Sequence, residues 1–122
     1  MRGVRGAITV EENSAEQIRN ATQELLKEML DRNSIRTEDI ISAIFTVTPD
    51  LDADFPASSA RDMGWDSVPM LCSNEIPVPG SLPYCIRVLL HVDTSLSQQA
   101  IHHVYLRKAQ KLRKDLTQPG ER

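Results

Sequence analysis

The sequence predicts an α+β fold in which a mixed β-sheet carries helices on one face. Alternating apolar residues typical of strands occur at 2–10 and at 86–92. A long amphipathic helix, predicted at 14–32, follows the first strand and is long enough for a crossover between parallel strands. The predicted order is β-α-β-(short α)-β-β-α, which combines strands and helices in one sheet-based architecture.

The first strand and the long helix have the clearest patterns. In 2–10, β-branched and alternating apolar residues predict a strand. The helix over 14–32 begins at Ser14, and Gln17 three residues later resembles a capping box. Apolar residues then recur at spacings of three and four, as on one helix face: Ile18, Ala21, Leu25, Leu26, Met29 and Leu30.

The middle of the chain alternates short elements with turns. Residues 37–39 suggest a short cap or turn, and the β-rich run 40–48 predicts a second strand. Pro56 fits the first turn of a short helix that Gly64 ends. The run 68–72 predicts a third strand, and a proline at its second position places it at a sheet edge or a strand start.

The last part of the chain contains a loop, a strand and a predicted second helix. The segment 74–83 has three of the seven prolines and is predicted to be an irregular, functional loop. The run 86–92 is the clearest strand. Apolar spacing predicts a second helix at about 97–109, again preceded by a capping-box pattern. The polar tail 111–122 is predicted to be mobile.

Composition limits the possible functions. A chain of 122 residues is expected to form one domain, and its net charge of −3 argues against a general nucleic-acid binder. No apolar run approaches the roughly 18–20 residues that span a membrane, and no signal segment is visible, so the expected location is the cytoplasm. The two cysteines are then expected to be free thiols.

Two arginines interrupt strands that otherwise look apolar. Arg5 alternates with Val4 and therefore points to the opposite face, and Arg87 points away from the face of Ile86 and Val88. An arginine within a sheet is costly unless an anion or a carboxylate accompanies it. We therefore predict a small anion site built from strands far apart in sequence.

Six segments of the chain, taken in order, resemble a known family. They are RGVRGAITVE, TPDLDADFPASSAR, GWDSVPMLCSNE, CIRVLL, HVYL and KLRKDL. Together they closely resemble the monofunctional chorismate mutases of the AroH type. The resemblance predicts a single domain over 1–116, followed by a short polar tail at 117–122.

The resemblance implies a trimeric pseudo-α/β-barrel with an active site at each subunit interface. The implied reaction is the pericyclic conversion of chorismate to prephenate, on the route to phenylalanine and tyrosine, without a cofactor or a metal. The alternative is a trimeric small-metabolite-binding protein of the same fold without mutase activity, because fold does not fix function.

The resemblance also implies three catalytic residues. Arg87 would donate to the ether oxygen and to a nearby carboxylate of the substrate. Arg5 would bind a substrate carboxylate, and Glu75 would accept from the substrate hydroxyl. From the residues alone, Arg87 could instead form an ion pair that only stabilises the sheet, and Arg5 and Glu75 could be exposed surface residues.

Further residues are implied to bind substrate. Tyr105 would hydrogen-bond a carboxylate, although half-burial on a helix is its alternative. Cys72 would contact the hydroxyl weakly or be buried as a small apolar residue. Leu112 and Arg113 begin a segment that can close over the site.

We expect the stretch from Phe55 to Arg61 to reach the site from a neighbouring subunit. Phe55 and Ala57 would line the pocket, and Arg61 would add positive potential at its entrance or lie solvated on a helix. Ser58 is a departure, because relatives can carry a basic residue there. Its presence puts substrate affinity in doubt rather than the chemistry.

Metal binding and nucleophilic catalysis are not predicted. His102 and His103 diverge by about 100° on a helix, and His91 has no partner at zinc-like spacing. The serines lack a nucleophile-elbow pattern.

Overall fold

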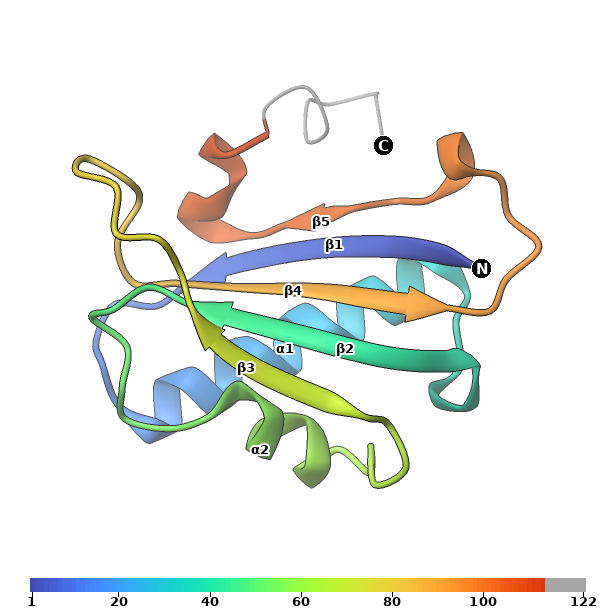
Figure 1. Ribbon diagram of the computed structural model, residues 1–122, viewed down its shortest axis with the longest axis horizontal. Helices are drawn as coiled ribbons and strands as arrows, with labels where there is room; N and C mark the ends of the chain where they lie inside the picture. The colour runs from blue at the N-terminus through green and yellow to red at the C-terminus, as the bar shows by residue number, and fades with distance from the viewer. Residues whose placement is uncertain (114–122) are drawn as a thin grey trace.

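The computed structural model describes residues 1–113, which fold into a five-stranded mixed sheet with two helices on one face (Figure 1). The strands are β1 (Arg2–Thr9), β2 (Ile40–Val47), β3 (Met70–Asn74), β4 (Cys85–Val92) and β5 (Val104–Tyr105). The helices are α1 (Ala15–Asn33) and α2 (Pro56–Asp62), and short 3-10 turns lie at Thr37–Asp39, Gln98–Ala100 and Arg107–Lys111. The predicted mixed sheet with helices on one face is therefore confirmed.

The sheet has the order β3-β2-β4-β1-β5. β4 is antiparallel to both β1 and β2, whereas β5 runs parallel to β1 and β3 runs parallel to β2. β3 is an edge strand, as its proline predicted, but it begins two residues later than expected. The carbonyl of Pro69 still accepts from the Ala43 amide at 3.0 Å, just before β3 begins.

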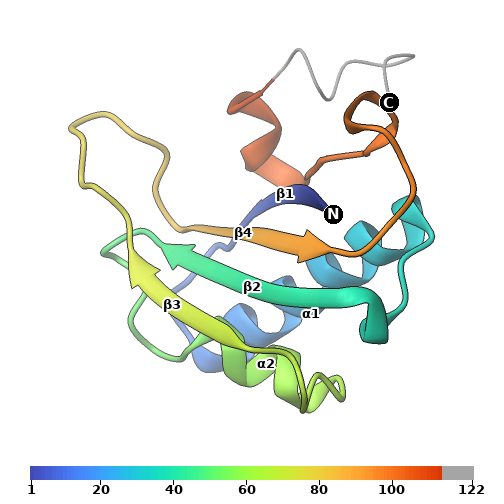
Figure 2. The ribbon, with the colours of Figure 1, turned by 45° about the vertical axis from the view of Figure 1, so that its right-hand side comes forward.

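The hydrophobic core lies between the sheet and the two helices (Figure 2). Val4 and Ile8 of β1 and Leu25 and Met29 of α1 are fully buried there. The alternation predicted for β1 and β4 is thus confirmed, because the face opposite the arginines is the face that packs against α1.

The capping of α1 is confirmed in part. The Ser14 hydroxyl accepts from the Gln17 amide at 3.1 Å. The Gln17 side chain accepts from the amides of Glu11 and Glu12, at 2.9 and 3.1 Å. It therefore ties the preceding loop to the helix, rather than completing a capping box. At the other end Ser34 adopts a left-handed conformation with φ 53° and ends the helix.

The predicted helix over 97–109 is wrong. The chain forms the 3-10 turn at Gln98–Ala100, the short strand β5 and a second 3-10 turn at Arg107–Lys111. β1 would otherwise be an open sheet edge, and the amide of Leu106 donates to the carbonyl of Ala7 at 2.9 Å beside it. Pairing with this edge outweighs the helix propensity of the run, which Ile101, Val104 and the two histidines lower at its centre.

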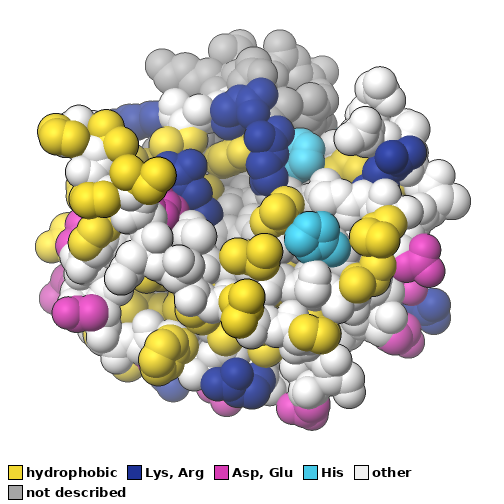
Figure 3. Space-filling model, viewed as in Figure 1, with side chains coloured by type: hydrophobic (Ala, Val, Ile, Leu, Met, Phe, Trp, Pro, Cys, Tyr) yellow, Lys and Arg dark blue, Asp and Glu magenta, His cyan; other side chains and the backbone are white. Residues whose placement is uncertain are grey.

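Within residues 1–113, the other face of the sheet carries no α-helix. Figure 3 shows hydrophobic side chains across its centre and left, with Lys and Arg side chains gathered in its upper part. Large apolar residues exposed in the chain include Ile44 of β2, Leu71 of β3, and Ile76 and Val78 of the proline-rich loop. Within residues 1–113, no helix is both long enough and apolar enough to cross a membrane. The part of the predicted tail beyond residue 113 lies outside the described residues.

Candidate active site

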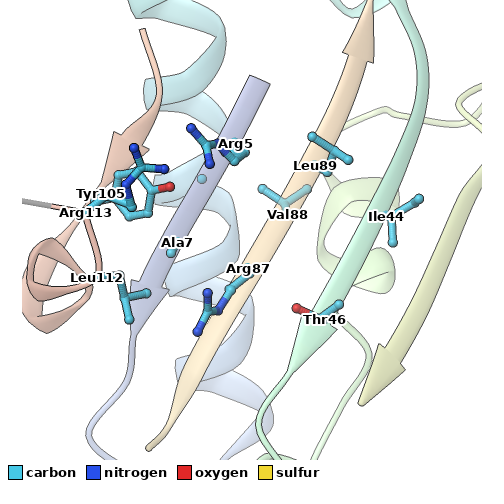
Figure 4. Close-up of a pocket in the computed structure, with 11 residues that line it drawn as sticks. Arg5, Ala7, Ile44, Thr46, Arg87, Val88, Leu89, Tyr105, Leu112 and Arg113 are labelled. Atoms are coloured by element: carbon cyan, nitrogen blue, oxygen red, sulfur yellow. The ribbon is translucent and has the colours of Figure 1, made fainter. Parts of the chain in front are cut away.

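A cavity of about 400 Å³ opens on the helix-free face, and we call it the arginine cavity (Figure 4). The strands β1, β2, β4 and β5 and the turn after β5 supply its walls. It is lined by Arg5, Gly6, Ala7, Ile44, Thr46, Arg87, Val88, Leu89, Tyr105, Leu112 and Arg113. Segments from the two ends of the described chain therefore meet in one concave site.

The two sheet arginines come together in this cavity. β1 and β4 are neighbours, with Arg5 opposite Leu89 and Ala7 opposite Arg87. The arginines therefore lie diagonally on one face of adjacent strands, within reach of a small shared ligand. The structure thus agrees with the geometric part of the prediction, that distant strands bring these two cations to one place.

Glu75 lies beside Arg87, where the loop begins after β3. Its Oε2 is 2.9 Å from Arg87 Nε, and the same oxygen accepts from the Thr46 hydroxyl at 2.7 Å. The amide of Glu75 donates to the carbonyl of Val47 at 2.9 Å, which fixes the backbone. The side chain of Glu75 is 14% exposed and that of Arg87 is 43% exposed. A largely buried carboxylate therefore holds the base of an arginine whose outer part is accessible.

The contact between Arg87 and Glu75 is ionic rather than a well-aligned hydrogen bond. Arg87 Nε is buried, and no acceptor among the described residues is aligned with its N–H. The short distance therefore reflects charge attraction, while the N–H direction is left unmatched.

Cys85 lies at the start of β4 and is fully buried. The pKa of its thiol is raised to about 11, mainly by burial; Arg87 lowers it in part, and the nearby carboxylates of Glu75 and Asp50 add to the rise. The thiol is therefore protonated at neutral pH and is a poor nucleophile. Covalent attack by this cysteine is therefore disfavoured.

Tyr105 reaches the cavity from β5. Its strand pairs with β1 through Gly6 and Ala7, and the tyrosine is only 7% exposed. Leu112 and Arg113 follow the last 3-10 turn and line the same cavity. The prediction that Tyr105 belongs with the arginines agrees with this arrangement, although a short strand and not a helix carries it.

Phe55 and Cys72 line a different cavity of about 340 Å³, which we call the β3 cavity. It lies between the start of α2 and the edge strand β3. Ala57 is buried within α2, and the Arg61 side chain donates to the Ser58 hydroxyl at 3.2 Å. One chain therefore does not bring these predicted residues to the arginine cavity. The expectation that 55–61 serves a neighbouring subunit therefore stays a prediction.

The comparison with protein families decides the classification. The model of the family described as chorismate mutase type I matches residues 1–116.

The chain belongs to this family.

Two relatives of this chain support its assignment to the type I chorismate mutases, and each match covers almost the whole chain. One is chorismate mutase AroH of Thermus thermophilus, 53% identical over 117 residues, covering 95% of this chain and 96% of the relative. Another is chorismate mutase AroH of Bacillus subtilis (strain 168), 43% identical over 118 residues, covering 96% and 93%. The solved structure of a chorismate mutase from Clostridium thermocellum has a TM-score of 0.90 and 54% identity, covering 91% of this chain and 99% of that one. The predicted family is confirmed.

Our sequence reasoning missed Thr46 of this type I chorismate mutase. Thr46 lies opposite Arg87 in the pairing of β2 with β4 and donates to Glu75. Alternation along β2 could have indicated it, because Ile44 and Thr46 share the face that lines the cavity. The partnership with Glu75 depends on β3 running beside β2, which sequence spacing alone does not reveal.

Among residues 1–113, no three His, Cys, Asp or Glu side chains cluster closely enough to hold a metal ion. Ser42 and His91 do lie together, with the serine Oγ 3.0 Å from the histidine Nδ1.

Proposed function

We propose that this protein is a chorismate mutase that converts chorismate to prephenate in the cytoplasm, on the route to phenylalanine and tyrosine. The observation that carries the proposal is the arginine cavity, where Arg5 and Arg87 converge beside Glu75 and Tyr105. This set of groups suits an anionic substrate that rearranges without a nucleophile. Family membership and the protonated state of Cys85 support the same reaction type.

The reaction proceeds in one pericyclic step. The ether C–O bond of chorismate breaks while a new C–C bond forms, and no proton or electron is exchanged with the protein. Negative charge grows on the ether oxygen in the transition state. Catalysis then requires a compact substrate conformer and donors fixed where charge develops.

Within this proposal each polar residue has one role. Arg87 donates to the ether oxygen and to a nearby carboxylate, and Glu75 holds Arg87 and accepts from the substrate hydroxyl. Arg5 and Tyr105 bind substrate carboxylates. Thr46 keeps the Glu75 carboxylate in position through its 2.7 Å hydrogen bond.

We further propose that the active enzyme is a homotrimer and that each site combines both cavities. Leu71, 70% exposed, and Phe55, 65% exposed, are large apolar side chains that water covers in a single chain. Leu71 also pairs with Ile44 of β2, which is exposed as well, and a contiguous exposed apolar patch of this kind marks an interaction face. Phe55, Ala57, Arg61 and Cys72 of one subunit would then meet the arginine cavity of the next, and Leu112 and Arg113 would close over the bound substrate.

The test is to mix purified protein with chorismate, follow its ultraviolet absorbance and identify prephenate as the product. We expect rapid, saturable loss of chorismate that a bicyclic transition-state mimic inhibits. Loss no faster than in buffer, from a protein that is folded by circular dichroism, would exclude mutase activity. That result would favour the alternative, a metabolite-binding protein.

The shared site has a test of its own. Light scattering should give the mass of three chains. Arg87→Ala and Arg61→Ala chains should each have reduced activity, and subunit exchange between them should restore part of it, because some interfaces then unite two intact halves. If subunits exchange but activity does not recover, either both residues belong to the same half of the site or Arg61 does not belong to the site.

A further inference from the structure

The wall of the arginine cavity formed by 104–113 has few backbone bonds to the sheet. β5 contains two residues, Val104 and Tyr105, and pairs with β1 at Gly6 and Ala7. Such a short strand is weak by itself. Yet this segment carries Tyr105, Leu112 and Arg113 into the cavity, so other contacts must fix its position.

Arg107, two residues beyond Tyr105, supplies such contacts. Its Nη1 donates to the Thr9 carbonyl at 2.9 Å at the end of β1, and its Nη2 contacts Glu24 Oε1 of α1 at 2.8 Å. The next amide, that of Lys108, donates to the Thr9 hydroxyl at 3.2 Å. One side chain therefore ties the segment both to the sheet and to the long helix.

The backbone of Arg107 also depends on these bonds. Its φ of 56° is left-handed, a conformation that residues other than Gly, Asn and Asp rarely adopt. Here the left-handed residue turns the chain from β5 into the last 3-10 turn, which brings Leu112 and Arg113 back to the cavity. The bonded guanidinium offsets the unfavourable conformation and keeps this reversal in place.

We propose that Arg107 is a positioning residue for substrate binding. Arg107 is not one of the residues that line the cavity. Through Thr9 and Glu24 it fixes the wall that presents Tyr105, Leu112 and Arg113, and so it sets the affinity for the dianionic substrate. The inference rests on the proposed function of the cavity.

The test compares three variants with a matched control on the same helix. Arg107→Asn tolerates the left-handed backbone but is too short to reach Thr9 or Glu24. Arg107→Lys keeps the charge without the forked donors, and Glu24→Ala removes one acceptor. The control is Asp31→Ala, which removes the exposed Lys27–Asp31 ion pair of α1, 3.0 Å long in this structure.

We expect Arg107→Asn to raise KM for chorismate about 2- to 10-fold, as for the loss of one or two hydrogen bonds. The kcat should change by less than about twofold, because uniform binding is lost. Glu24→Ala should show a smaller rise, Arg107→Lys should recover part of the loss, and Asp31→Ala should match the wild type. Amide hydrogen exchange should accelerate over 104–113 in Arg107→Asn and Glu24→Ala.

A normal KM in Arg107→Asn overturns the proposal, and a lower melting temperature without a change in KM makes Arg107 merely structural. If Arg107→Asn does not fold, Arg107→Lys and Glu24→Ala decide by the same criteria. Failure of the wild type to convert chorismate would refute the proposed function instead. Unchanged amide exchange in the variants would refute the positioning role separately.

Discussion

Replacing Arg87 by alanine separates catalysis from stability. The substitution removes the guanidinium that Glu75 holds at 2.9 Å. If Arg87 stabilises charge on the ether oxygen, its loss removes an interaction made mainly in the transition state. We therefore expect kcat to fall more than KM rises, while the protein remains folded.

The structure gives different magnitudes for the two effects. Loss of one preorganised donor lowers the rate about 100- to 1000-fold, or about 3–4 kcal/mol of transition-state stabilisation. The Arg87 side chain is 43% exposed but that of Glu75 only 14%, so water screens the ion pair in part and its loss should cost about 1–2 kcal/mol of stability. Glu75 would keep its hydrogen bond from Thr46. The loss of activity should thus exceed the loss of stability by at least about 1 kcal/mol.

The assay measures kcat and KM by chorismate absorbance and the free energy of unfolding by urea denaturation. Arg36→Ala is the matched control, because Arg36 also forms ion pairs, at 3.6 and 3.7 Å, but its side chain is 72% exposed and lies outside both cavities. The control should keep its activity. Near-native kcat in Arg87→Ala would refute the electrostatic role of Arg87, and parallel losses of activity and stability would refute the separation.

Three other changes test the site and its support. Burial raises the pKa of Cys85 from its ordinary value of 9.0 to about 11, so the unfolded thiol ionises first. The contribution of the Cys85 thiol to the free energy of unfolding is fully present below pH 9, and the free energy falls by about 2–3 kcal/mol as the pH rises towards 11. The unfolding free energies of Cys85→Ala and the wild type, measured at pH 8 and pH 11, should show this difference, and identical pH profiles would contradict it. Removing the chain from Leu112 onwards should raise KM about tenfold and lower kcat less, as for one lost charged contact, whereas an unchanged KM in steady-state assays would remove the tail from the site. Gly6→Ala should cost about 1–3 kcal/mol in urea denaturation, because its Cβ would overlap the sulfur of Met29. Gly3→Ala, whose Cβ would lie 3.5 Å from Leu89 Cδ1, is the control and should be nearly neutral.

Alternation within strands was enough to predict which face of the sheet carries the two arginines of the site. The period of two places Arg5 and Arg87 opposite the core face of their own strands, and a sheet buried on one side fixes that choice. Their meeting required β1 and β4 to be neighbours, which the sequence did not specify. Glu75 was associated with Arg87 through family resemblance, and the parallel pairing of β2 with β3 explains how the loop carries it there.

The misassigned segment 97–109 shows where local patterns fail. Ile101, Val104 and Tyr105 are spaced as on one helix face, but the same residues also suit a short strand. Tertiary contacts determine the conformation of this segment. The amide of Leu106 donates to the open edge of β1, and the side chain of Arg107 donates to the Thr9 carbonyl. A left-handed arginine near the end of a predicted helix has no recognisable local signal.

Local charge and overall charge have opposite signs in this protein, and that difference bears on how it binds its substrate. The chain has a net charge of −3, yet Arg5, Arg87 and Arg113 all line one cavity. At physiological salt, exposed charges farther away than about 8 Å are largely screened, so a bound dianion responds mainly to these nearby guanidinium groups. The net negative charge of the protein then repels the substrate while it approaches, and has little effect on the substrate once it is bound. Raising the salt concentration should therefore weaken long-range repulsion and local attraction together, and the balance of the two determines how KM depends on salt.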